Sequence, residues 1–355
     1  MRVFNIGQLL TMEQGIDLIE NAYLDWHQGR ITGYGPMSEV SSVEDTDIDA
    51  HGCVVLPGFV DCHTHLAHAG QMHGSFADRC AAVEQIPLAQ LSEDIEQRLR
   101  SMTRLGTTTV EIKTGYATSV AAIQKCLQAV PSRPGIILTE MSPLANSSAP
   151  LWTLANQPRF IDALCDQDGF SPEQLREPLH AMRSLEARIK LHVCVTAPGD
   201  GVPLALEMNA TSVDHLLFAT DRDIQLLARS STTAVLLPAM AYYSRLGRFA
   251  PARALLDSGA RVALATDCNP GDSPTWSMPF VIHLAVREMQ MSVEEALQAA
   301  TIHAAVAIGE SHRVGSLRVG KDADFLLLAT QDYRDVPSVM GANLVERVFR
   351  NGVEQ

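Results

Sequence analysis

Long apolar segments are missing from this chain of 355 residues. Nowhere does it contain a run of about 18 consecutive apolar residues, the length that a membrane-spanning helix requires. Residues 1–15 also lack the apolar stretch and the small-residue cleavage site of a secretory signal. The sequence therefore predicts a soluble protein that has no membrane partner.

Patterned cysteines and basic runs are missing as well. The seven cysteines are scattered, odd in number and form no C-x-x-C pair, which favours a reduced chain over a disulfide framework. The formal net charge of −14 and the lack of any basic run argue against binding to nucleic acid or to an anionic membrane. We expect a cytoplasmic protein that acts on a small molecule.

Apolar, β-branched runs are what the chain does contain. Most of them are nearly continuous, as in strands whose two faces are both buried, and helical patterns lie between them. The eight runs are residues 57–65, 107–115, 135–141, 159–169, 188–195, 211–217, 232–240 and 261–271. Eight βα units in series predict an α/β fold of the TIM (β/α)8 barrel type.

Two of the intervening segments carry clear helix signals. Apolar side chains recur at helical spacing within residues 91–102, and we expect Ser92 to be the N-cap of that helix. Further along, Ser171, Pro172 and Gln174 match an N-cap, a first helical residue and a capping-box partner. Both segments support the alternation of strands and helices.

The two ends of the chain read differently from the middle. Residues 1–56 and 316–355 show short strands and turn signals without a long helix. Because they bracket the barrel, we expect them to pair into one small β-sandwich domain. The barrel itself is predicted to span residues 57–315.

Histidines concentrate at the end of the first predicted strand. The segment "PGFVDCHTHLAHAGQMHGSF" holds His63, His65, His68 and His73. Residues i and i+2 of a strand face the same side, so His63 and His65 can both point into the barrel mouth. His68 and His73 are more simply interpreted as loop residues, and their roles stay open.

Other polar residues lie near the ends of distant strands, where the active site of a TIM barrel is built. A lone buried histidine is more often structural than a ligand, but a set that shares one edge of one barrel favours a metal site. Three histidines and a carboxylate suit Zn²⁺ or Fe²⁺, and such a site can activate water. The candidates from which such ligands would come are four histidines and one carboxylate: His63, His65, His192, His215 and Asp267.

Two further motifs lie at strand ends. In "EIKTGY", Lys113 could be carboxylated and bridge two metal ions, or it could be an amine that hydrogen-bonds neighbouring carboxylates. In "ATDCNPG", Asp267 precedes a rigid turn that can present backbone amides to a ligand. A carboxylate in contact with both metal and water can also pass a proton to a leaving nitrogen.

These motifs resemble those of the amidohydrolase superfamily, and within it the imidazolonepropionase branch, over nearly the whole chain. The segments that carry the resemblance are "PGFVDCHTHL", "VEIKTGY", "SVDHL", "ALATDCNPGDSPT" and "VGSLRVGKDADFLLL". The resemblance implies a barrel with a composite β-sandwich, homodimers, and one Zn²⁺ or Fe²⁺/Fe³⁺ ion per subunit. It also implies ring opening of 4-imidazolone-5-propanoate by water to N-formimino-L-glutamate, a step in histidine degradation.

Matching positions imply a role for each site residue. His63, His65, His192 and Asp267 match the metal ligands, and His215 matches an acid/base beside the water. Asp267 also takes part in proton transfer. Tyr116 and Asn269 match substrate-binding residues.

Three substrate-contact positions depart from the family pattern. Met72 stands where the family has an arginine, Met141 where it has a histidine, and Val195 where it has a glutamate. Met72 cannot replace an arginine that grips a carboxylate. We therefore expect intact metal machinery and an altered substrate contact set.

Three hypotheses follow. The chain is an imidazolonepropionase in which other groups replace the missing contacts, or a related cyclic amidohydrolase or deaminase for a less anionic heterocycle, or a non-catalytic barrel with a binding role. The complete metal set argues against the third. The substitute groups that we expect under the first are His68, His73, Arg79 or Arg245.

Overall fold

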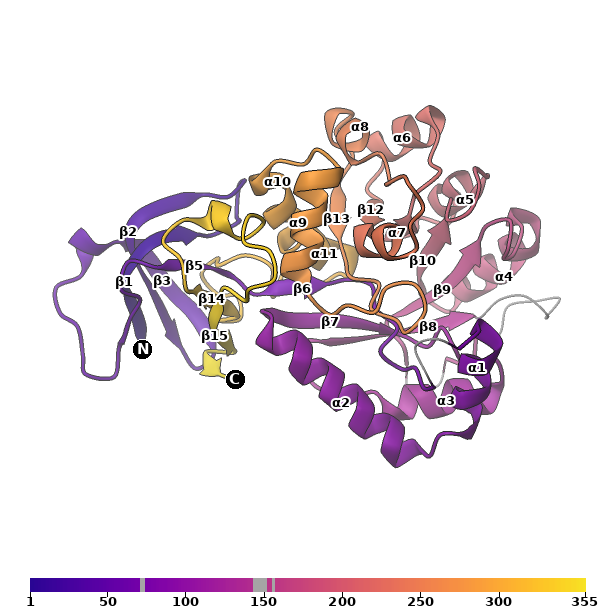
Figure 1. Ribbon diagram of the computed structural model, residues 1–355, viewed down its shortest axis with the longest axis horizontal. Coiled ribbons are helices and arrows are strands. Elements are labelled where there is room, and N and C mark those ends of the chain that lie inside the picture. The colour runs from indigo at the N-terminus through magenta and orange to yellow at the C-terminus, as the bar shows by residue number, and fades with distance from the viewer. Residues whose placement is uncertain (71–73, 143–151, 155–156) are drawn as a thin grey trace.

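A barrel of eight parallel strands forms the larger part of the molecule (Figure 1). The computed structural model describes residues 1–70, 74–142, 152–154 and 157–355. The strands follow one another around the barrel in chain order: β6 (Phe59–Asp61), β7 (Thr107–Lys113), β8 (Ile136–Ser142), β9 (Phe160–Cys165), β10 (Arg188–Val193), β11 (Ser212–His215), β12 (Thr233–Leu236) and β13 (Val262–Leu264). Each of the eight predicted runs contains one of these strands, except that β8 ends one residue beyond its run, so the predicted barrel is confirmed.

Helices surround the barrel as an outer layer (Figure 1). Among the described residues they are α1 (Phe76–Gln85), α2 (Leu88–Arg104), α3 (Val120–Ala129), α4 (Pro172–Ser184), α5 (Gly201–Glu207), α6 (Asp221–Ala228), α7 (Pro238–Tyr243), α8 (Ala252–Asp257), α9 (Met278–Glu288), α10 (Val293–Ala299) and α11 (Ile302–Ala307). The capping box of Ser171 and Gln174 at the start of α4 is confirmed. The predicted N-cap at Ser92 is wrong, because α2 already begins after Pro87, its N-cap residue, which has a φ of −62° and an extended backbone.

The barrel closes where its first and last strands meet. The backbone N–H of Asp267 donates to the carbonyl of His63 at 3.0 Å, and that of His65 donates to the carbonyl of Cys268 at 2.9 Å. These bonds lie beyond the regular ends of β6 and β13, so Asp267 follows its strand by three residues instead of ending it. The closure brings Asp267 beside the two histidines of the H-x-H motif.

A second, mixed sheet is built from both ends of the chain. Its strand order is β16-β15-β14-β5-β1-β2-β3, and β4 pairs with β1. The strands are β1 (Arg2–Leu10), β2 (Leu18–His27), β3 (Arg30–Pro36), β4 (Ile48–Asp49), β5 (Val54–Pro57), β14 (Phe325–Leu328), β15 (Val345–Arg350) and β16 (Val353–Glu354).

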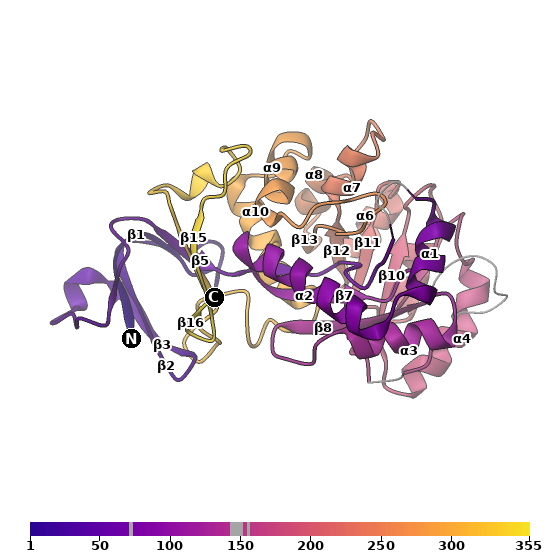
Figure 2. The same cartoon turned by 60° about the horizontal axis from the view of Figure 1, so that its bottom comes forward.

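The core of this small domain joins distant parts of the sequence. The ring of Trp26 lies 5.2 Å from that of Phe325 and 6.0 Å from that of Phe349, measured between centroids. Both views place the two chain ends in this sheet, beside the barrel (Figures 1 and 2). The predicted β domain built from both termini is confirmed, and its boundaries at residues 57 and 316 stay predictions. No helix among the described residues is long and apolar enough to cross a membrane.

Candidate metal centre

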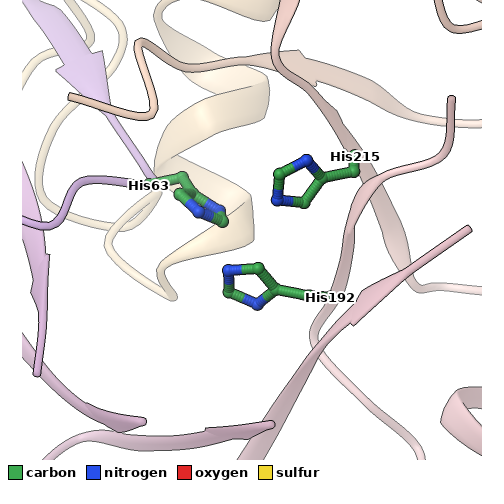
Figure 3. Close-up of side chains that lie close together, drawn as sticks. All are labelled: His63, His192 and His215. Atoms are coloured by element: carbon green, nitrogen blue, oxygen red, sulfur yellow. The ribbon is translucent and has the colours of Figure 1, made fainter. Parts of the chain in front are cut away.

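The structure brings the five predicted metal-centre residues together at one end of the barrel. His192 lies in β10, His215 ends β11, and the other three lie at the closure of the barrel. All five are buried, with 8% exposure or less. Two sets of possible ligand atoms each lie within 4.8 Å of one another, one from His63, His192 and His215 and one from His63, His65 and Asp267. Figure 3 shows the rings of His63, His192 and His215 facing one another.

The nitrogen atoms that face the centre lack partners. Nε2 of His63 and Nε2 of His192 are buried, and neither has a hydrogen-bond partner among the residues that the structure describes. Nε2 of His63 and Nε2 of His65 each lie 3.5 Å from Oδ1 of Asp267. Buried polar atoms are normally bonded, so unpaired lone pairs that converge on a carboxylate fit a divalent cation.

Two carboxylates contact the rings of His63 and His192 at Nδ1, the nitrogen that does not face the centre. Nδ1 of His63 lies 2.7 Å from Oδ2 of Asp214, and Nδ1 of His192 lies 3.1 Å from Oδ1 of Asp162. A carboxylate at Nδ1 favours the tautomer whose Nε2 carries the free lone pair, as in many metal sites. Neither acid was predicted from the sequence as part of the site. A sequence signal for them exists, because each acid is a charged residue inside an apolar strand run. A charge on a strand that is buried on both faces needs a partner of opposite charge or a hydrogen-bond donor.

Burial keeps three histidines of the centre, His63, His65 and His215, uncharged. It lowers the pKa of His215 to about 3, helped by the neighbouring His192. Burial and nearby positive groups also hold the pKa values of His63 and His65 well below the usual range. Neutral imidazoles are the form that binds metal or accepts a proton. Burial raises the pKa of Asp267 well above its usual range, and a cation at the centre would oppose that shift.

Left-handed backbone occurs at the ends of the strands that carry the site. His215 has a φ of 79°, Asp267 has 53°, and Cys194, two residues after His192, has 51°. This conformation is unfavourable for residues with a Cβ and is concentrated at functional sites. The same conformation also occurs at non-glycine residues of the small β domain, such as Asn5 and Asn351, so the centre is defined by its side chains and not by the backbone.

Tyr116 and Asn269 lie together next to the metal centre. The hydroxyl of Tyr116 donates to Oδ1 of Asn269 at 3.2 Å, and the ring centroids of Tyr116 and His65 are 6.0 Å apart. Oδ1 of Asn269 also accepts from the backbone amides of Gly271 and Asp272, both at 2.8 Å. In this structure those two amides shape the turn instead of facing a ligand.

The structure describes two of the three positions that depart from the family pattern, Met72, Met141 and Val195. Met72 lies outside the described residues. Met141 lies in β8 beside the centre, since a Cβ added to Gly115 would collide with the ring of His65 and press on Sδ of Met141. Gly115 therefore permits the close approach of the backbone to His65. Val195 is half-buried after β10.

Among the proposed substitutes, Arg79 lies closest to this group. His73 lies outside the described residues, and Arg245 is exposed after α7. The guanidinium of Arg79 lies 5.8 Å from the ring centroid of Tyr116 and packs against Gly271. Arg79 is only 9% exposed, and its Nε has no partner among the described residues. The ring of His68 is 6.5 Å from that of Tyr116.

Lys113 lies in ion pairs below the centre. Its Nζ is 2.5 Å from Oδ2 of Asp162 and 3.2 Å from Oδ2 of Asp214. Burial lowers the pKa of Lys113, but Asp162, Glu111 and Asp214 outweigh burial and raise it above the usual range. These contacts favour the amine that bonds carboxylates over the carboxylated, metal-bridging form.

Sequence comparisons agree with this geometry. A family model described as the Amidohydrolase family matches residues 54–354. An imidazolonepropionase from Herpetosiphon aurantiacus is 34% identical, with 99% of this chain and 96% of that protein covered. One from Salinispora arenicola is 36% identical, with 99% and 98% covered.

Solved structures share the fold at low identity. An atrazine chlorohydrolase from Arthrobacter aurescens TC1 complexed with zinc superposes with a TM-score of 0.77 at 16% identity, covering 99% of this chain and 94% of that one. Guanine deaminase from E. coli gives a TM-score of 0.73 at 18% identity, covering 100% and 98%. With the family match and the full-length relatives, the chain belongs to the amidohydrolase family and, within it, to the imidazolonepropionase-like branch.

Proposed function

We propose that this protein is an imidazolonepropionase, a hydrolase that opens the ring of 4-imidazolone-5-propanoate to give N-formimino-L-glutamate in histidine degradation. The observation that carries the proposal is the convergence of His63, His65, His192 and Asp267, with unpaired ring nitrogens, in one buried centre. The full-length similarity to proteins named imidazolonepropionase supports the choice of substrate.

The four ligand residues would hold one divalent ion per subunit, Zn²⁺ or Fe²⁺. When bound, such an ion polarises a carbonyl group and lowers the pKa of water. Asp162 and Asp214 orient two of the ligand rings through their Nδ1 atoms. The buried surroundings of the centre keep the imidazoles of His63 and His65 neutral at neutral pH, the form that ligation requires.

His215 and Asp267 move the protons of the reaction. His215 is neutral in this buried cluster and lies beside the ligand rings, so its free ring nitrogen can accept a proton from the attacking water. The oxygen of that water bonds to the ring carbonyl carbon, and the bond from this carbon to the ring nitrogen breaks. His215 and Asp267 deliver the proton to the leaving nitrogen, which becomes part of the formimino group.

Arg79 supplies the positive charge for the propionate group of the substrate. It is buried against Tyr116 and Gly271, and the structure gives it no ion-pair partner among the described residues. A guanidinium can bind a carboxylate through two parallel hydrogen bonds. This arrangement offers an arginine near the centre although Met72 occupies the family's arginine position.

Changing Arg79 should weaken substrate binding. We expect Arg79→Met to raise the KM for 4-imidazolone-5-propanoate about 10- to 100-fold, the scale of a lost charge-assisted hydrogen bond. Steady-state kinetics measure the effect, and Arg245→Met is the matched control because Arg245 is exposed. Equal KM values for the two variants would remove Arg79 from the substrate site.

The substrate assignment has a direct test. Purified protein loaded with Zn²⁺ or Fe²⁺ should open 4-imidazolone-5-propanoate and prefer it to neutral cyclic amides and to aminated heterocycles. Formation of N-formimino-L-glutamate can be followed by mass spectrometry. Turnover of a neutral heterocycle together with inactivity on the imidazolone would overturn the proposal in favour of a related amidohydrolase or deaminase.

The cellular setting and assembly are also part of the proposal. All seven cysteines are free, which supports a reducing compartment such as the cytoplasm. The homodimer rests on the family resemblance.

A further inference from the structure

Five charged side chains form a layer inside the barrel, below the metal centre. They are fully buried and comprise two cations and three anions: Lys113, Lys190, Glu111, Asp162 and Asp214. Burial of charges is costly unless each is paired, so the pairing within this layer is tightly constrained. The proposed mechanism uses the two aspartates and leaves both lysines without a role.

One lysine contacts both of the carboxylates that hold ligand rings. Nζ of Lys113 lies 2.5 Å from Oδ2 of Asp162 and donates to Oδ2 of Asp214 at 3.2 Å. The other oxygen of Asp162 faces Nδ1 of His192, whereas Oδ2 of Asp214 is shared between Lys113 and Nδ1 of His63. A single ammonium group therefore connects the supports of two ligand histidines.

The strands that contribute these groups explain how the contact arises. Lys113 is on β7, Asp162 on β9 and Asp214 on β11, and these are alternate strands of the barrel. Side chains from alternate strands fill the same interior layer of a TIM barrel. The ligand strand β10 lies between β9 and β11, so His192 is flanked on both sides by strands that Lys113 contacts.

We propose that Lys113 is a positioning residue that fixes the distance and orientation of His63 and His192 through Asp214 and Asp162. Two buried carboxylates without the ammonium between them would repel each other and turn away from their present positions. The ring nitrogens that depend on them would then no longer converge. This inference rests on the proposed metal centre.

Lys190 provides a matched control in the same layer. Its Nζ is 2.5 Å from Oε2 of Glu111 and donates to the carbonyl of Cys62 at 2.9 Å. It is 4.0 Å from Asp214, and none of its ion pairs involves Asp162. Removing Lys190 therefore removes an equally buried cation that reaches only one of the two carboxylates, Asp214, and from a longer distance than Lys113 does.

The test measures metal affinity of chelator-stripped protein. Competition with a chromogenic chelator should show that Lys113→Met weakens Zn²⁺ binding about 10- to 100-fold, the usual effect of losing an outer-shell partner. Lys190→Met should stay close to the wild type. The visible spectrum of Co²⁺-loaded protein, which reports ligand geometry, should change for Lys113→Met alone.

The outcomes distinguish a failure of the proposed metal centre from a failure of the positioning role of Lys113. Lack of Zn²⁺ binding by the wild-type chain would overturn the metal centre and the role of Lys113 with it. Wild-type binding together with unchanged affinity and an unchanged Co²⁺ spectrum in Lys113→Met would overturn the role of Lys113 alone. An equal loss in Lys190→Met would do the same, since the effect would belong to the whole charged layer.

A second variant covers the case in which Lys113→Met does not fold. Lys113→Met combined with Asp162→Asn removes one cation and one anion, and the asparagine oxygen can still accept from Nδ1 of His192. We expect this folded protein to lose Zn²⁺ affinity over the same range. Wild-type affinity in the double variant would contradict the positioning role.

Discussion

Replacing His192 with alanine should release the metal and abolish hydrolysis. Nε2 of His192 is one of the unpaired atoms that converge on the centre, and the ring is already held at Nδ1 by Asp162. A Lewis acid contributes several kcal/mol to the stabilisation of such a transition state, so we expect kcat/KM to fall at least about 1,000-fold. Metal analysis of the purified variant and steady-state kinetics measure the two effects.

A histidine outside the centre is the control for this change. Nδ1 of His303, on α11, lies 2.9 Å from the carbonyl of Val262, and among the described residues His303 forms no hydrogen bond or ion pair with the five residues of the centre. His303→Ala should keep its metal and most of its activity. If His192→Ala retained a full equivalent of metal and turned over normally, His192 would not be a ligand.

Replacing His215 should separate chemistry from metal binding. We choose His215→Asn because His215 has a φ of 79°, a conformation that asparagine tolerates better than most residues. Loss of a general acid/base should lower kcat about 100- to 10,000-fold, while Zn²⁺ affinity changes little. Chelator competition measures the Zn²⁺ affinity of the variant, and steady-state kinetics on the metal-loaded variant measure its kcat.

The geometry makes this comparison informative. His215 lies in the same set of close ligand atoms as His63 and His192, so a role as a ligand is the alternative. A loss of Zn²⁺ affinity as large as that in His192→Ala would make His215 a ligand. An unchanged kcat with metal bound would remove it from proton transfer.

Much of the fold and the centre could be predicted because the signals are local. The H-x-H motif places two rings on one side of a strand, and polar residues at the ends of buried strands share one end of a barrel. His192 and His215 were therefore predicted from strand patterns alone, and the structure places both at the centre. The position of Asp267 does not follow from a strand pattern alone. Asp267 lies three residues beyond β13, and it reaches the histidines because the first and last strands of the barrel meet there.

The partners of the ligands could not be read from local patterns. Asp162 and Asp214 meet His192 and His63 across the barrel interior, and that contact depends on the register of strands distant in the sequence. Arg79 was one of several substitutes for the missing arginine, and its burial against Tyr116 depends on where α1 packs. The start of α2 lies upstream of the expected cap at Ser92, after Pro87, which is a local signal that the prediction did not use.

The closure of the barrel has a thermodynamic consequence. The backbone hydrogen bonds that join the ends of the first and last strands are made by His63, His65, Asp267 and Cys268, three of which belong to the metal centre. An ion held by these side chains would cross-link the same two strands, so its binding free energy would add to the stability of the folded barrel. Binding of the metal ion and folding of the barrel would then be coupled equilibria.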